Sequence, residues 1–239
     1  MMKLAAAATL ALLVVTTQAF ANDMTEAQAQ MAEARVYLDK ASGQYDYAKG
    51  ESLLRKAAET GLPEAQYTMG LLSLGAFGNP PDFVAAADWF AKASSQGYTA
   101  ATHELGVLYM DGRGVPRDVV RAAALIGEAA EKGNTDAMLD YGVLVFRGEG
   151  VQQNEKIGAQ WLLLAARRGN VVAQNRVARI YAFGKGVARD PVEAMSWNIL
   201  ASRGGRSDSE LDSILADLSE ADKAEAMRRA DAFKPASKP

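Results

Sequence analysis

A repeat of 36 residues constrains the fold of this chain more than any other feature of its sequence. An alanine opens four successive units and a glycine closes each of them, at Ala65, Ala101, Ala137 and Ala173 and at Gly97, Gly133, Gly169 and Gly205. Self-similarity at a fixed period of this length is typical of solenoids, in which each unit packs on its neighbours. The period predicts five units, at residues 29–64, 65–100, 101–136, 137–172 and 173–208.

Each unit is predicted to hold two helices, which we call helix A and helix B. In the third unit the apolar residues of helix A have the i, i+4, i+7, i+8 spacing of one helix face, at Ala101, Leu105, Leu108 and Tyr109. A loop follows with two glycines, at which positive backbone angles end the helix and turn the chain. In the last three units it reads Gly112-Arg113-Gly114, Gly148-Glu149-Gly150 and Gly184-Lys185-Gly186. These loops lack the G-K-[ST] of a phosphate-binding loop, so we interpret them as structural turns.

Helix B is predicted to begin after an N-cap residue, at Asp82, Asp118, Asn154 and Asp190. Asp190 and Glu193 also have the spacing of a capping box. The inner face of helix B carries one large and one small residue per unit: Trp89, Leu125, Trp161 and Trp197, and Ala93, Ala129, Ala165 and Ala201. This pattern predicts that the tryptophans belong to the core, and no cofactor is expected.

The two ends of the chain depart from the repeat. Residues 1–21 combine a positive start, an apolar run and Ala19-Phe20-Ala21, which predicts a signal peptide cleaved after Ala21 and a periplasmic or secreted protein. The alternative, a membrane anchor, is disfavoured because the apolar run is short. Residues 22–28 are predicted to be a linker. Residues 209–233 are predicted to form two capping helices, the first with Leu211, Ile214, Leu215 and Leu218 on one face, followed by a disordered tail at 234–239.

The pattern within the units resembles the Sel-1-like repeat, a relative of the tetratricopeptide repeat. The third unit carries Leu105-Gly106, Tyr109, Gly112, Gly114-Val115, Asp118, Ala122, Ala129-Ala130 and Gly133 in the matching order. The fifth carries Tyr181, Gly184, Gly186-Val187, Asp190, Ala194, Trp197, Ala201 and Gly205. Departures from the pattern are Leu125 in place of tryptophan, Gly158 in place of alanine and Ala178 in place of glycine. The resemblance covers residues 29–208.

The resemblance implies an all-α fold, a right-handed α/α superhelical solenoid that serves as a scaffold or adaptor for other proteins. Some exported relatives regulate an envelope signalling complex by binding the sensor domain of a kinase. Cysteine-rich relatives have been described as β-lactamases, but this chain has no cysteine, so that activity is not carried over. The resemblance therefore favours a binding protein and not an enzyme.

Composition excludes further classes of function. A net charge of −3 and a pI near 5.4 disfavour nucleic-acid binding, which needs a basic face. His103 is the only histidine, and without cysteine or a second histidine no metal site is expected. We considered a pH-sensing role for His103 but expect a surface histidine with ordinary hydrogen bonds.

A second face of helix A is predicted to bind a partner, because it is more apolar than a solvated surface. By the geometry of related solenoids this face lines the concave groove. Its residues are Tyr67, Leu71, Leu74, His103, Val107, Met110, Leu139, Val143, Phe146, Arg147, Asn175 and Arg179. The partner would be a peptide, a helix or a sensor domain. The alternative is that these side chains only pack helix A against its neighbours.

Charge and composition leave two further questions open. The fifth unit is locally basic, which favours an acidic partner surface or an anionic glycan, although a solvated charged face has the same composition. Its basic residues are Arg176, Arg179, Lys185, Arg189, Arg203 and Arg206. An envelope hydrolase, or a protein that binds peptidoglycan or another glycan, is the alternative to a protein scaffold. A hydrolase triad would have to use His103, and no G-x-S-x-G motif is present.

Overall fold

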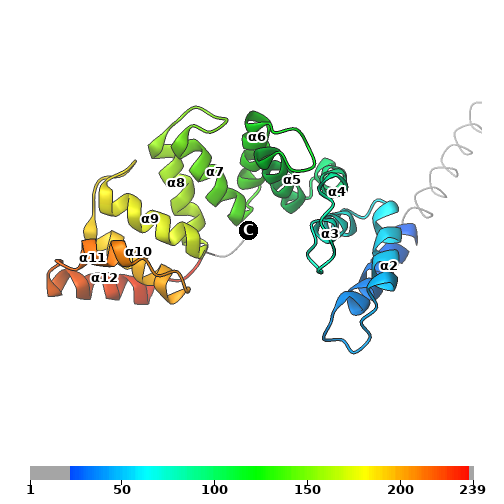
Figure 1. The fold of residues 1–239 in the computed structure, drawn as a ribbon. Coiled ribbons are helices and arrows are strands. Elements are labelled where there is room, and N and C mark those ends of the chain that lie inside the picture. The colour runs from blue at the N-terminus through cyan, green and yellow to red at the C-terminus, as the bar shows by residue number, and fades with distance from the viewer. Residues whose placement is uncertain (1–21, 237–239) are drawn as a thin grey trace, which may run out of the picture. The chain divides into compact units, whose positions relative to one another are not determined.

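The structure, a computed structural model, describes residues 22–236, and all regular secondary structure in this range is helical (Figure 1). The predicted signal peptide and residues 237–239 lie outside the described residues. After a helix over residues 22–38 come α2 (Tyr47–Glu59), α3 (Pro63–Ser73), α4 (Phe83–Ser95), α5 (Thr99–Asp111), α6 (Val119–Glu131), α7 (Thr135–Arg147), α8 (Glu155–Arg167), α9 (Val171–Phe183), α10 (Pro191–Arg203), α11 (Ser209–Leu215) and α12 (Glu220–Ala232). This alternation confirms the predicted all-α solenoid of helix pairs.

The described residues divide into two compact units, residues 22–101 with 113–115 and residues 102–112 with 116–236. The first unit has its core between the helix over residues 22–38, α2, α3 and α4, with Leu54, Met69 and Phe90 almost fully buried. The core of the second unit runs from α6 to α11 and is made mostly of alanines packed around Ile126, Leu162, Val177 and Trp197. Each unit therefore holds its own hydrophobic core.

Helix A packs closely on helix B because a glycine of helix A lies at their contact. A side chain at Gly70 would overlap the ring of Phe90, one at Gly106 would overlap Ile126, and one at Gly142 would press on Leu162. The close approach of the two helices therefore requires glycine at these positions. It explains why a residue that weakens an isolated helix returns at this position.

The predicted N-caps of helix B are confirmed in the second to fifth repeats. The side chains of Asp82, Asp118, Asn154 and Asp190 each accept a hydrogen bond from the backbone three residues later. The capping box at Asp190 is only half formed. The Asp190 N–H donates to the Tyr181 carbonyl oxygen at 3.0 Å, while the Glu193 carboxylate accepts from Trp197 and Arg229. The second half is missing because both of its groups already have other partners.

The backbone hydrogen bond made by the N-cap closes the loop between helix A and helix B in the same way in all five repeats. The N-cap N–H groups of Asp46, Asp82, Asp118, Asn154 and Asp190 donate to the carbonyl oxygens of Tyr37, Ser73, Tyr109, Val145 and Tyr181, at 2.7 to 3.0 Å. The first two repeats lack the G-x-G sequence yet keep this bond. The closure therefore depends on the backbone, and several loop sequences satisfy it.

In the last three repeats, the second glycine of the G-x-G loop contacts the preceding repeat. Gly114, Gly150 and Gly186 have positive φ angles of 73°, 73° and 69°. A Cβ atom at these positions would overlap the backbone carbonyl groups of Phe83, Val119 and Glu155, respectively, each in the first turn of the preceding helix B. Only glycine meets both conditions, which confirms and extends the interpretation of these loops as structural turns.

The C-terminal helices pack on α10, and two details differ from the sequence prediction. Ile214 is 40% exposed, because α11 ends at Leu215 and buries only Leu211 and Leu215. In the segment predicted to be a disordered tail, Ala236 donates its N–H to the Arg167 carbonyl oxygen at 2.8 Å. At the other end, residues 22–28 are helical, in contrast to the predicted linker, because Ala27 and Met31 are buried in the core of the first unit.

The contact made by Gly186 predicts a specific stability difference. Gly205 also has a positive φ, of 86°, but a side chain there would meet nothing within 4 Å. We expect Gly205→Ala to cost about 1–2 kcal/mol, which is the strain of alanine in this conformation. Gly186→Ala should cost about 1–3 kcal/mol more, because its methyl group meets a backbone carbonyl that has no room to move. Urea unfolding of the two variants measures the difference, and equal losses would show that the contact is not restrictive.

Candidate functional site

Residues of α5, α7 and α9 line three adjoining hollows in the second unit, which we call the A-helix groove. The first has a volume of about 220 Å³ and is lined by Val107, Met110, Ile126, Asp140, Val143, Leu144 and Arg176. The second, of about 190 Å³, is lined by Val143, Phe146, Arg147, Leu162, Arg176, Arg179 and Ile180. The third, of about 750 Å³, is lined by Asn175, Arg176, Arg179 and residues 205–210. Shared residues connect the hollows, and Arg176 lines all three.

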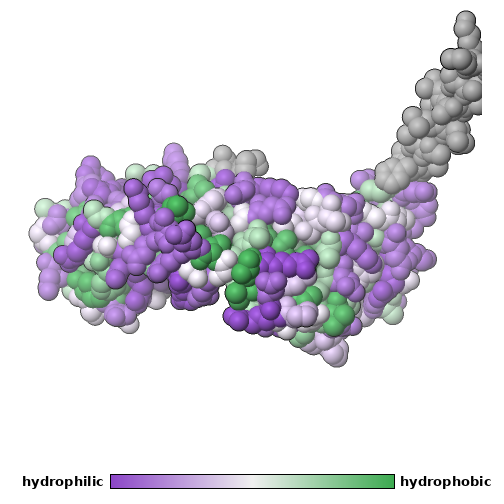
Figure 2. All heavy atoms as spheres, turned by 90° about the horizontal axis from the view of Figure 1, so that it is seen from above, coloured by the Kyte–Doolittle hydropathy of each residue, from purple (hydrophilic) through white to green (hydrophobic). Residues whose placement is uncertain are grey.

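The first two hollows combine apolar walls with arginines. Val143 and Phe146 pack against the core of the second unit and at the same time form part of the wall. Figure 2 shows that apolar residues on the visible surface gather in small groups bordered by hydrophilic residues. A ligand of the groove must therefore offer polar and apolar contacts together.

A glycine of α8 positions Phe146. Gly158 stands where the repeat pattern has alanine, and a Cβ atom there would overlap the Cβ atom of Phe146 and the carbonyl oxygen of Gly142. The loss of one methyl group lets α7 approach α8 closely. It thereby holds Phe146 at the wall of the second hollow.

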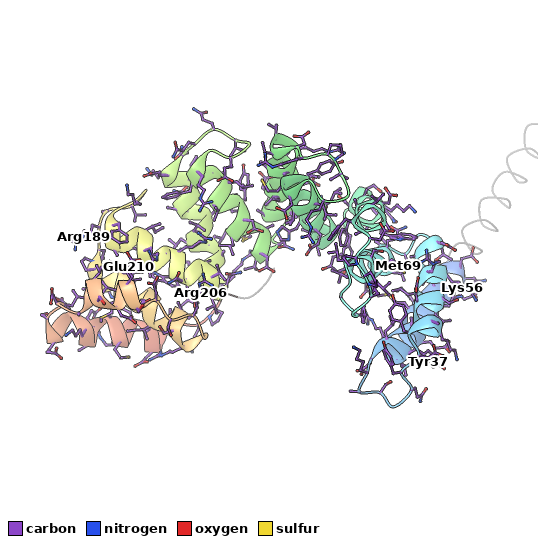
Figure 3. All side chains as sticks on the ribbon, viewed as in Figure 1. Tyr37, Lys56, Met69, Arg189, Arg206 and Glu210 are labelled. Carbon is purple, nitrogen blue, oxygen red and sulfur yellow. The ribbon has the colours of Figure 1, made fainter. Side chains whose placement is uncertain are left out.

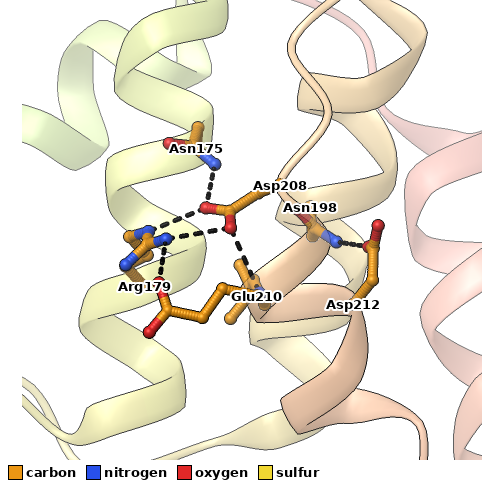
Figure 4. A network of polar contacts seen from close by, with 7 residues as sticks. Asn175, Arg179, Asn198, Asp208, Glu210 and Asp212 are labelled. Carbon is orange, nitrogen blue, oxygen red and sulfur yellow. Dashed lines mark hydrogen bonds and ion pairs between the residues drawn. The ribbon is translucent and has the colours of Figure 1, made fainter.

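The third hollow ends at a polar cluster that joins α9 to the C-terminal helices (Figure 4). Arg179 donates through Nε to Asp208 at 2.7 Å and through Nη2 to Asp208 at 2.9 Å and to Glu210 at 2.8 Å. Asn175 donates to Asp208 at 2.9 Å. The hydrogen bonds from Arg179, together with those from Asn175 and the Leu211 N–H, lower the pKa of Asp208 to about 2. This cluster attaches the C-terminal cap to the last repeat.

Arg176 is a cation at the centre of the groove, where it lines all three hollows. Its Nε is buried and has no hydrogen-bond partner among the described residues. Burial, and then the like charges of Arg147 and Arg206, lower the pKa of Arg176, while Asp140 acts in the opposite direction. A guanidinium nevertheless stays charged at neutral pH. The centre of the groove therefore holds an incompletely paired positive charge.

His103 links α5 to α7. Its Nε2 lies 2.8 Å from Oδ2 of Asp140, and the residue is only 8% exposed. The expectation of a surface histidine was therefore wrong. Burial lowers the pKa of His103, but the hydrogen bond and charge of Asp140 and the charges of Glu104 and Asp136 together outweigh it and raise the pKa. Burial also raises the pKa of the neighbouring Glu104.

The structure brings most of the predicted partner-binding residues of the second unit to one groove. Val107, Met110, Val143, Phe146 and Arg147 line the first two hollows. Leu139 is half-buried on α7 and packs on the core. Tyr67 and Leu71 lie on α3 of the first unit, Leu74 is the C-cap residue that follows this helix, and all three are half-buried. The centroid of the Tyr67 ring lies 5.0 Å from that of Tyr98 and 5.8 Å from that of Phe90.

Three predicted residues make contacts that assign them a structural role as well. His103 is bound to Asp140, and Asn175 and Arg179 hold Asp208. Partner binding by these three, as by the other nine, stays a prediction.

The sequence prediction missed Arg176 and Asp140. Arg176 was noted only as part of the basic fifth unit, because it lies one position from Asn175, outside the helical face that was assigned to the groove. Asp140 occupies the same place relative to Leu139. Long side chains reach beyond the face on which their Cα atoms lie, and this is the signal that could have identified both residues.

The described residues contain neither a candidate metal site nor a candidate membrane-spanning helix. Within residues 22–236 there is no group of three or more histidine, aspartate and glutamate side chains arranged to hold a metal ion. Over the same range, no helix has both the length and the apolar content needed to cross a membrane.

Comparison with known proteins follows the repeat. The family model of the Sel1 repeat matches residues 25–62, 63–98, 99–134, 135–170 and 171–205. A solved structure of a protective antigen of uropathogenic Escherichia coli, which displays an SLR fold, is 29% identical with a TM-score of 0.73 over 86% of this chain. A Sel1 repeat protein from Oxalobacter formigenes is 24% identical, with a TM-score of 0.72, and the match covers 87% of this chain and 88% of that one.

The match to the antigen has a limit. It covers 45% of that protein, so this chain spans less than half of its length. No curated protein is significantly similar in sequence to this chain.

The contact between His103 and Asp140 predicts a pH-dependent stability. Because the pKa of His103 is raised in the folded state, the contact stabilises the fold fully below about pH 6.5, the ordinary value, and this contribution is lost as the pH rises through the raised pKa. We expect the free energy of unfolding to fall between pH 6 and 8.5 by more in the wild type than in His103→Gln. Because the charge of His103 lowers the pKa of Glu104, both proteins are compared in a Glu104→Gln background, so that their difference isolates the histidine. An equal fall in the free energy of unfolding of the two proteins between pH 6 and 8.5 would contradict the prediction.

Proposed function

This chain belongs to the Sel1 repeat family, and from that premise we propose that it is an exported scaffold whose A-helix groove binds a protein partner. Sel1 repeats generally mediate protein–protein interaction, and scaffolds of this family are generally not enzymes. The observation that carries the proposal is the continuous groove along α5, α7 and α9, in which apolar hollows adjoin arginine side chains. Protein interfaces commonly combine such elements, with apolar contacts at the centre and charged groups around them.

The place and pathway of action form the finer part of the proposal. The signal-like composition of residues 1–21 supports export to the periplasm or beyond. There the partner would belong to an envelope signalling complex, such as the sensor domain of a kinase.

Affinity capture with groove variants tests the proposal. We expect the protein to capture a partner from envelope extracts, and expect Phe146→Asp to abolish capture because it places a charge in the wall of an apolar hollow. Val120→Asp is the matched control, since Val120 is 65% exposed on α6 and lies outside the A-helix groove. Mass spectrometry of the captured proteins, with circular dichroism of each variant, gives the result.

A second variant guards against loss of folding. Arg147 has an exposed side chain at the second hollow, so Arg147→Glu reverses a charge at the groove without disturbing the core. A partner that is captured equally by the wild type, Phe146→Asp and Arg147→Glu would show that the groove is not the binding site. Recovery of cell-wall fragments instead of a protein would favour the glycan-binding alternative.

A further inference from the structure

The pairing of charges in the A-helix groove leaves a positive excess at its centre. Asp208 and Glu210 are both bound to Arg179, and Asp140 is bound to His103. The pair between Arg147 and Glu149 is long, at 3.5 Å, and exposed. Arg176 and Arg206 both line the third hollow, and Arg206 is exposed; Figure 3 shows Arg206 on the segment that leads to Glu210 at the start of α11. The carboxylates that line the groove are therefore already paired with side chains other than Arg176.

The guanidinium of Arg176 is only partly paired, since within residues 22–236 its Nε has no hydrogen-bond partner. A buried donor without a partner costs free energy, and the cost is larger for a charged group. The like charges of Arg147 and Arg206 add to the cost, because they act on Arg176 in the same direction as burial does. A carboxylate placed in these hollows would pair with the guanidinium of Arg176, which lines all three, and would neutralise the repulsion among the arginines.

The apolar hollow beside Arg176 indicates what accompanies the carboxylate. Its walls include Val143, Phe146, Leu162 and Ile180, and its volume of about 190 Å³ is sufficient for one large side chain. An apolar cavity of about 150 Å³ accommodates a benzene ring. Arg176 lines this hollow and the polar third hollow alike. A ligand would therefore present its acid and its apolar group close together.

We infer that the A-helix groove recognises an acidic protein segment, with an aspartate or glutamate carboxylate bound by Arg176 beside Arg147 and Arg206 and a large apolar side chain of the same segment in the hollow over Phe146. This inference rests on the proposed function and names the chemistry of the partner. A glycan or a free anion supplies the charge but lacks the apolar side chain, so an acidic peptide fits the two observations better.

Labelled peptide pools test the inference directly. One pool of 12-residue peptides carries a leucine or phenylalanine within three residues of an aspartate or glutamate, and the matched pool replaces each acid by asparagine or glutamine. By fluorescence anisotropy with the full mature protein, we expect the acidic pool to bind and the amide pool to bind at least about tenfold more weakly, since a charge-assisted hydrogen bond is lost. Equal binding of the two pools would overturn the inference.

Variants of Arg176 separate recognition from general attraction. Arg176→Gln should weaken binding of the acidic pool at least about tenfold, and Arg176→Lys should restore it only in part, because lysine keeps the charge but lacks the guanidinium fork. Lys185→Gln is the matched control, since it removes one positive charge from an exposed loop of the same repeat that lines none of the three hollows. Equal weakening by Lys185→Gln would show that only net charge matters, against the inference.

The urea midpoint distinguishes a binding role from a structural role for Arg176. If Arg176 stabilised the fold, Arg176→Gln would lower the midpoint. Because the guanidinium is incompletely paired, Arg176→Gln should leave the urea midpoint unchanged or raise it while it weakens binding. A lowered midpoint with retained peptide binding would assign Arg176 to the fold and overturn the inference.

Two outcomes separate this inference from the proposed function. Capture of a partner that depends on Phe146 but not on Arg176 would leave the scaffold intact and refute the acidic segment. Binding of polyglutamate as tightly as the acidic pool would show recognition of charge alone and would refute the apolar part. If every groove variant retained both partner capture and peptide binding, the groove would not be the binding site, and both proposals would be refuted.

Discussion

The contact between a loop glycine and the backbone of the preceding repeat sets the arrangement on which the rest of the structure depends. Gly150 and Gly186 place their Cα atoms against carbonyl groups in the first turn of the preceding helix B, where a side chain would not fit. The distance between neighbouring repeats is therefore fixed at a point where no side chain intervenes. The A helices take their places from this spacing, and in the second unit those helices form the groove.

The fold was predictable because its determinants are local and repeated. The N-caps, the glycine turns and the helix faces each depend on residues within one unit, and a fixed period reveals them together. The errors lie at the ends of the chain, where no period helps. Residues 22–28 join the first helix because Ala27 and Met31 complete the core of the first unit.

The candidate site was predictable only in part. The apolar residues Val107, Val143 and Phe146 follow from helical spacing, and the structure places them at the groove. The charged residues do not follow, because the role of a long side chain depends on which partner it reaches. Arg179 reaches Asp208, 29 residues away, whereas the Nε of Arg176 has no hydrogen-bond partner among residues 22–236. No spacing rule distinguishes these two arginines.

Backbone contact between repeats has a consequence for how such a chain changes over evolutionary time. Since the junctions at Gly150 and Gly186 face a backbone carbonyl group and the Cβ atom of one alanine, Ala123 or Ala159, they require small residues at these points and depend on few other side chains. A whole unit can be duplicated or deleted and still present the same surface to its neighbours. The residues of the groove are then free to diverge from one copy to the next, so new specificity arises by sequence drift on an unchanged frame.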